Sequence, residues 1–172
     1  MDYFQKNASF TIRPCSCMFA PFHGNTMTSQ LHTPSEHGFP ETADIDTASD
    51  DYATRFAGPA GKWLLDVQER IALDFIAHSG ARTILDVGGG HGQLAIPLCS
   101  KGSDVTVLGR DASCRRRIAG IVDSGKCKFV IGNAIALPFP DRAFDMAISF
   151  RLLTHCARWP ELARELCRVA RS

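Results

Sequence analysis

A cluster of glycines directly after a short apolar run is the part of this chain best suited to chemistry. The cluster consists of Gly88, Gly89, Gly90 and Gly92. Residues 83–87 before it predict a buried parallel strand, and apolar residues at helical spacing follow it. Glycines permit positive φ and close approach of a ligand to the backbone, and a helix start offers unpaired N–H groups. This strand, turn and helix predict half of a nucleotide-cofactor site.

The spacing of the glycines distinguishes between kinds of cofactor loop. A dinucleotide-binding loop has the form Gly-x-Gly-x-x-Gly. Its last position falls on Gln93 when counted from Gly88 and on Ala95 when counted from Gly90, so neither frame matches cleanly, although alanine is tolerated there. A phosphate-binding P-loop is excluded because no Gly-Lys-Ser/Thr follows. The chain instead has an acid, one residue, and then glycine at positions 88, 90 and 92.

A second strand is predicted over residues 104–108, which are apolar and β-branched. Asp111 follows it, and an acid at this point can accept hydrogen bonds from a ribose diol. The alternative role is an N-cap for a helix predicted over residues 112–122. A shorter register would put Gly109 at the ribose position. Both roles of Asp111 stay open, and the two are compatible.

Five segments in this order resemble the motifs of class I S-adenosylmethionine-dependent methyltransferases. The first motif of that family has the form Asp-Val-Gly-x-Gly-x-Gly, and Asp86 is the acid in this chain. The resemblance is to the type 11, small-molecule branch that includes quinone-biosynthesis methyltransferases. The matching segments are residues 82–98, 104–111, 129–141, 144–150 and 159–169.

The resemblance implies an α/β fold with a Rossmann-like parallel sheet, flanking helices and S-adenosylmethionine as cofactor. It places Asn133, where the family has an acid, beside the adenine; the alternative is a turn residue that fixes its own backbone. The end of the strand over residues 144–150 faces the reacting methyl group in relatives. The implied cofactor-binding residues are Asp86, Gly88, Gly89, Gly90, Gly92, Asp111, Asn133, Ala134 and Phe150.

Methyl transfer to a small-molecule acceptor requires the nucleophile, the methyl carbon and the sulfur to be held in line and water to be excluded. Acid–base groups matter less. An oxygen nucleophile would need a base, for which His155 is the candidate, and a packing residue is the alternative. The catalytic residues are otherwise unassigned. Two other functions stay open: a non-catalytic cofactor-binding remnant or partner subunit, and an NAD-dependent oxidoreductase, which the glycine spacing disfavours.

The chain ends at Ser172, where the family continues into three further strands. We therefore expect a truncated, incomplete sheet of four strands in the order third, second, first, fourth, without strands 5–7. In that arrangement the fourth strand has an open edge, and part of the substrate pocket is absent.

Composition predicts a cytoplasmic protein of one domain. The chain has 172 residues, 45% of them apolar, and a formal net charge of +1, so nothing favours nucleic acid as a partner. No apolar run reaches the ~18 residues of a membrane span. The seven cysteines lack Cys-x-x-Cys spacing, which favours reduced thiols and argues against a metal site. The oligomeric state is not predicted.

The pattern of apolar residues along the chain changes near residue 50. Residues 1–50 lack periodicity and are predicted to be disordered; residues 51–172 are predicted to form the partial methyltransferase domain. A helix that Gly80 ends is expected early in it, over the cofactor cleft as in relatives, with one apolar stripe: Trp63, Leu64, Val67, Ile71, Phe75 and Ile76. Before it, Tyr52, Arg55 and Phe56 either line the methionine end of the cleft or pack on the surface.

Overall fold

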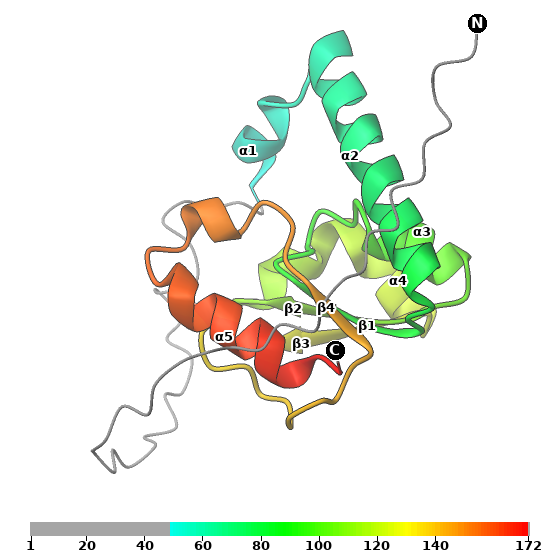
Figure 1. Cartoon of the computed structure of the whole chain (residues 1–172). Coiled ribbons are helices and arrows are strands. Elements are labelled where there is room, and N and C mark those ends of the chain that lie inside the picture. The colour runs from blue at the N-terminus through cyan, green and yellow to red at the C-terminus, as the bar shows by residue number, and fades with distance from the viewer. Residues whose placement is uncertain (1–48, 172) are drawn as a thin grey trace, which may run out of the picture. The chain divides into compact units, whose positions relative to one another are not determined.

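A parallel sheet forms the centre of the computed structural model, which describes residues 49–171 (Figure 1). The predicted disorder of residues 1–50 falls almost entirely outside this range. The described strands are β1 (Thr83–Val87), β2 (Asp104–Gly109), β3 (Cys127–Ile131) and β4 (Met146–Ile148). They are parallel and ordered β3-β2-β1-β4. The predicted fold class and strand order are therefore confirmed.

Helices cover both faces of the sheet, which is why β1 is buried from Ile84 to Val87. One face packs against the C-terminal part of α2 (Gly58–Ser79), α3 (Ala95–Ser100) and α4 (Ala119–Asp123). The other face packs against α5 (Trp159–Val169). Ile84 belongs to the first of these clusters and Leu85 to the second, and both are fully buried.

The helix α5 packs one apolar side against the sheet, and its polar side chains bond to the loop after β3. Leu162 and Val169 are buried on its inner side. Arg168 donates hydrogen bonds to the carbonyl oxygens of Phe139 and Leu137 and pairs with Glu165. On the exposed face of the helix, Glu161 pairs with Arg158, three residues earlier.

The strand β4 is shorter than the predicted 144–150. The Asp145 carboxylate accepts hydrogen bonds from the backbone N–H groups of Arg82 and Thr83, which draws the chain out of the ladder before Met146. Phe144 forms a parallel bridge with Ala170, so the chain after α5 returns alongside the start of β4. The strand therefore begins at Met146, and it ends at Ile148; its position in the sheet is as expected.

The helix predicted over residues 112–122 is divided in two. It begins as the 3₁₀ helix η1 (Ala112–Ile118) and continues as α4. Asp111 is its N-cap, because its side chain accepts the backbone N–H of Ser113. The predicted cap is thus confirmed, and the regular α-helical geometry is not.

The predicted helix before β1 is confirmed as α2, with Gly80 in the left-handed conformation at its end (φ 71°). The predicted stripe, by contrast, is mostly not covered. Ile76 is buried, whereas Trp63, Ile71 and Phe75 are 66%, 61% and 60% exposed. The reason is the direction of the helix: its N-terminal half extends away from the sheet (Figure 1).

The short helix α1 (Asp50–Thr54) precedes α2, and Ser49 caps it by accepting the backbone N–H of Tyr52. Between residues 49 and 171, no helix is both long and apolar enough to cross a membrane.

Candidate functional site

The glycine turn lies at the carboxyl end of β1, where ligands bind in open α/β sheets. Gly88 and Gly92 have positive φ, 83° and 73°. A Cβ on Gly89 would overlap the carboxylate of Asp86, and one on Gly90 would lie 2.5 Å from the carbonyl oxygen of Cys114. Four glycines are therefore required by conformation or by close approach.

Asp86 is the buried acid of this turn. It is 2% exposed, and its Oδ1 has no hydrogen-bond partner among the described residues. Burial raises the pKa of Asp86 to about 7, against an opposing effect from the positive charge of Arg151. A carboxylate held in this way favours a cationic group placed against it.

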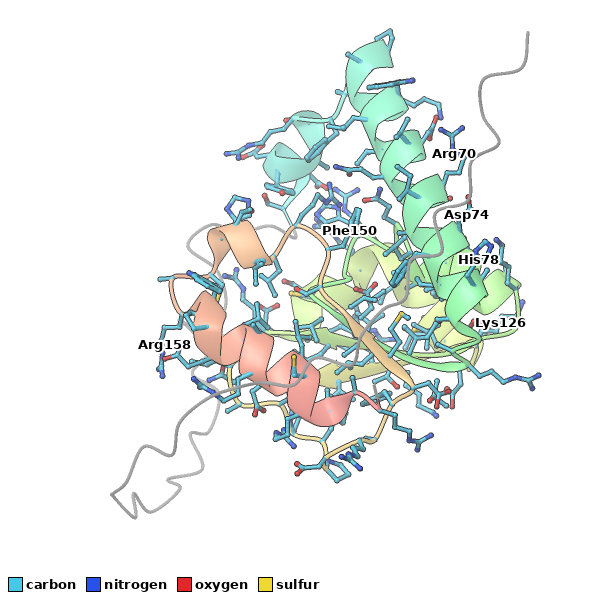
Figure 2. All side chains as sticks on the ribbon, in the orientation of Figure 1. Arg70, Asp74, His78, Lys126, Phe150 and Arg158 are labelled. Atoms are coloured by element: carbon cyan, nitrogen blue, oxygen red, sulfur yellow. The ribbon has the colours of Figure 1, made fainter. Side chains whose placement is uncertain are left out.

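A small cavity of about 10 Å³ opens beside this carboxylate. It brings the start of the glycine turn together with the chain that leaves β4. Its lining residues are Asp86, Gly88, Gly89, His91, Gln93, Leu94, Phe150 and Arg151. Asp86, Gly88, Gly89 and Phe150 are among the predicted cofactor residues, so the structure brings these four to one place. In Figure 2, Phe150 lies between the sheet and α1.

Arg151 is a site residue that the sequence reasoning missed. It has a left-handed backbone (φ 70°), and its buried Nε has no hydrogen-bond partner in the described part of the chain. Burial lowers the pKa of its guanidinium, while Tyr52 and Asp86 act in the opposite direction. Its position just after β4 was the available signal, because residues at strand carboxyl ends face the ligand crevice.

The helix α1 brings aromatic side chains to the same place. Tyr52 is buried, and its ring contacts those of Phe56, His91 and His155 at centroid distances of 5.7, 5.8 and 5.7 Å. Arg151 lies 4.8 Å from the centroid of the Phe56 ring. Tyr52 and Phe56 therefore lie beside Arg151, although neither lines the cavity, and His155 packs edge-on against Tyr52.

An ion pair at the other end of α1 connects it to η1. Asp50 pairs with Arg116 at 3.3 Å and also with Arg117. The helix α1 is therefore fixed both to the chain after β2 and to the chain after β4.

The side chain of Asp111 is fixed by hydrogen bonds from its neighbours Ser113 and Arg110. Its Oδ1 accepts the backbone N–H and the hydroxyl of Ser113 at 2.8 and 2.6 Å, and its Oδ2 accepts Arg110 Nε at 3.1 Å. Partial burial would raise the pKa of Asp111, but the hydrogen bonds from Ser113 and Arg110 outweigh it and lower the pKa. The alternative position, Gly109, has no room for a side chain, since a Cβ would lie 2.7 Å from Cys114 Cβ.

Asn133 and Ala134 follow β3. The side-chain oxygen of Asn133 accepts the backbone N–H of Ile135 at 3.0 Å, which is the turn role weighed above. Ala134 is buried in the core on the α5 side. Their contact with an adenine, like the ribose contact of Asp111, stays a prediction.

The parallel sheet and the glycine turn at the end of β1 are the arrangement expected for the class I methyltransferase fold. A family model described as a methyltransferase domain matches residues 85–172, just over half of the chain, and the chain belongs to this family. The cofactor that this family implies is S-adenosylmethionine.

Curated relatives are similar over the same part of the chain. An uncharacterized methyltransferase of Mycobacterium avium (strain 104) is 31% identical over 93 residues, which cover 54% of this chain and 37% of that protein. The ubiquinone/menaquinone biosynthesis C-methyltransferase of Dinoroseobacter shibae is 31% identical over 107 residues, 58% and 42% of the two chains. The chain thus spans less than half the length of these relatives.

Solved structures agree on the fold. A protein of Pyrococcus horikoshii has a TM-score of 0.52 and 23% identity, covering 77% of this chain and 58% of its own. A Methanococcus maripaludis protein assigned as an S-adenosyl-L-methionine-dependent methyltransferase has a TM-score of 0.52 and 23% identity, covering 68% and 60%. At this level of identity the similarity shows the fold alone.

Proposed function

We propose that the chain is the cofactor-binding part of an S-adenosylmethionine-dependent methyltransferase that acts on a small-molecule acceptor. The observation that carries this proposal is a pair of opposite, buried polar atoms in one cavity. Asp86 Oδ1 and Arg151 Nε both lack hydrogen-bond partners among the described residues, and both residues line the cavity beside the glycine turn. Buried polar groups without partners are rare in proteins and call for an explanation.

The methionyl end of S-adenosylmethionine fits this pair. It carries an ammonium and a carboxylate on one carbon, and these match a buried carboxylate and a guanidinium. The acid of the turn, Asp86, favours an ammonium over a phosphate in this cavity, because two negative groups would repel each other. On the adenosine side, the proposed contacts are Asp111 for the ribose and Asn133 with Ala134 for the adenine. The oxygens of Asp111 and Asn133 would use lone pairs beyond those given to Ser113, Arg110 and Ile135.

The cavity is smaller than a full cofactor site. Sites for ligands of this size are commonly about 300–1,000 Å³, whereas this cavity is about 10 Å³, roughly the space of one water molecule. Phe150 and Arg151, which line it, must move for the whole cofactor to enter.

Bound here, the cofactor would supply an electrophilic methyl group on a sulfonium. This chain contributes position and exclusion of water: the glycine backbone sets the approach, and Tyr52 and Phe56 cover the methionyl end. His155 is the proposed base for an oxygen nucleophile, because it lies within ring contact of Tyr52. For a nitrogen or carbon acceptor we assign no base.

Calorimetry on the full chain tests the proposal. We expect S-adenosylmethionine to bind and NAD not to bind. We also expect S-adenosylhomocysteine to bind more tightly than methylthioadenosine, which lacks the amino-acid end. Arg151→Gln should shrink that difference. Arg55→Gln is the matched control, because Arg55 also stacks on Tyr52 (5.4 Å) but does not line the cavity.

Two results would contradict the proposal: NAD bound in preference to S-adenosylmethionine, or no binding of either. Turnover of labelled methyl groups is a separate measurement. Binding without turnover would favour the non-catalytic alternative.

A further inference from the structure

An exposed apolar ridge runs along α2. Trp63, Val67, Ile71 and Phe75 are spaced four residues apart, and side chains at that spacing form one continuous ridge on a helix. Three of them are about two-thirds exposed, and Val67 is half-buried. Leu64, 39% exposed, lies beside the ridge. No part of the described chain covers this surface, and a contiguous apolar patch of this kind marks an interaction site.

A row of charges runs beside the ridge at the same spacing. It consists of Lys62, Asp66, Arg70 and Asp74, so the sign alternates along the helix. All four are exposed, and Lys62 pairs with Asp66 at 3.0 Å within the helix. Figure 2 shows Arg70, Asp74 and His78 following one another down one side of α2.

This row is complementary to itself when reversed. About a two-fold axis near residue 68, Asp66 of one helix faces Arg70 of the other, and Lys62 faces Asp74. The same antiparallel arrangement, within about one residue, sets Val67 against Ile71 and Trp63 against Phe75. In a parallel pair the two charged rows would instead lie on opposite sides of the contact and would not meet. A two-fold axis requires this kind of reciprocal contact.

We propose that the ridge on α2 is a homodimer interface, in which a second copy of this chain packs its own α2 antiparallel to the first. The apolar ridge supplies the stability of the interface. Exposed ion pairs contribute little binding energy. The charges therefore set the relative direction and register of the two helices rather than the affinity of the dimer. This proposal does not depend on methyl transfer.

Analytical ultracentrifugation of the full chain tests it, with and without substitutions in the ridge. We expect the wild-type chain to be dimeric at micromolar concentration. Ile71→Asp should raise the dissociation constant at least ~30-fold, as for a central interface residue. Circular dichroism should show an unchanged fold, since Ile71 is exposed.

The two tryptophans offer a matched control. Trp63 and Trp159 are 66% and 55% exposed, and Trp159 is at the start of α5. Trp63→Ala should weaken the dimer, and Trp159→Ala should leave its dissociation constant unchanged. Equal effects of the two substitutions would overturn the proposal.

Exchanging the charges of Asp66 and Arg70 tests whether the two helices are antiparallel. Asp66→Arg should weaken the dimer by up to ~5-fold per ion pair, and the double variant Asp66→Arg with Arg70→Asp should restore it. A double variant no better than the single one would overturn the antiparallel arrangement. A monomeric wild-type chain would overturn the dimer itself. If hydrogen exchange then showed the ridge protected in that monomer, the occupant would be another segment of the same chain.

Discussion

The apolar residues of β1 and those of α2 differ in what covers them. In β1, Ile84, Leu85 and Val87 are fully buried between helices on both faces of the sheet. In α2, the ridge that includes Trp63 and Ile71 lies open. Apolar periodicity thus shows that a segment has a face to cover. It does not show whether the covering surface belongs to the same domain.

The largest effect should separate these two segments directly. Leu85→Ala should lower the free energy of unfolding by about 2–5 kcal/mol, because it leaves a cavity in a fully buried site. Ile71→Ala, on the open ridge, should change it by less than about 1 kcal/mol in the monomer. Urea denaturation, with protein concentration varied for the α2 variant, measures both. Similar losses would show that the ridge is covered within one chain.

The next effect concerns the glycine turn. Gly89→Ala should cost about 1–3 kcal/mol of stability and abolish binding of S-adenosylmethionine, because the new Cβ overlaps the Asp86 carboxylate. Gly120→Ala is the control, since a Cβ there meets nothing within 4 Å. Calorimetry measures the binding of S-adenosylmethionine to both variants, and thermal denaturation measures their stability. Retained binding by the Gly89 variant would remove this turn from the proposed site.

A pH dependence should follow from Asp86. Its pKa rises from 3.8 to about 7 on folding, so the folded chain binds more protons between those values. Stability should therefore fall as pH increases from about 4 to about 7. Asp86→Asn should remove this slope and be more stable than wild type at neutral pH. A slope unchanged by the substitution would assign the dependence to another group.

The smallest effect concerns the attachment of α1. Asp50→Asn removes the exposed ion pairs with Arg116 and Arg117 and should cost less than about 1 kcal/mol of global stability. We expect faster amide exchange in α1 with no change in β1. Exchange that accelerates equally in both would mean that α1 is part of the cooperative core.

Much of the fold was predictable because its signals are local. The apolar strand before Gly88, the cap at Asp111 and the left-handed Gly80 each depend on residues within a few positions. Local rules also located the glycine turn and its buried acid, Asp86. They did not anticipate the shortening of β4, which depends on Asp145 binding the backbone of residues 82 and 83.

The candidate site was only half visible in the sequence. The glycine turn and Phe150 were expected, whereas Arg151 became a site residue only when β4 and β1 were placed side by side. Asp111 and Asn133 show the converse limit: their residue types suit a nucleoside, but hydrogen bonds to Ser113 and Ile135 use part of that capacity.

Sequence alone located the turn that a cofactor would approach, since this follows from short-range backbone chemistry and glycine spacing. The family and the order of the strands followed from the resemblance of five motifs to class I methyltransferases. Tertiary structure decided which apolar face is covered and which charges meet. Burial and electrostatic pairing depend on neighbours far away in the chain, as Arg151 beside Asp86 and the open ridge of α2 both show.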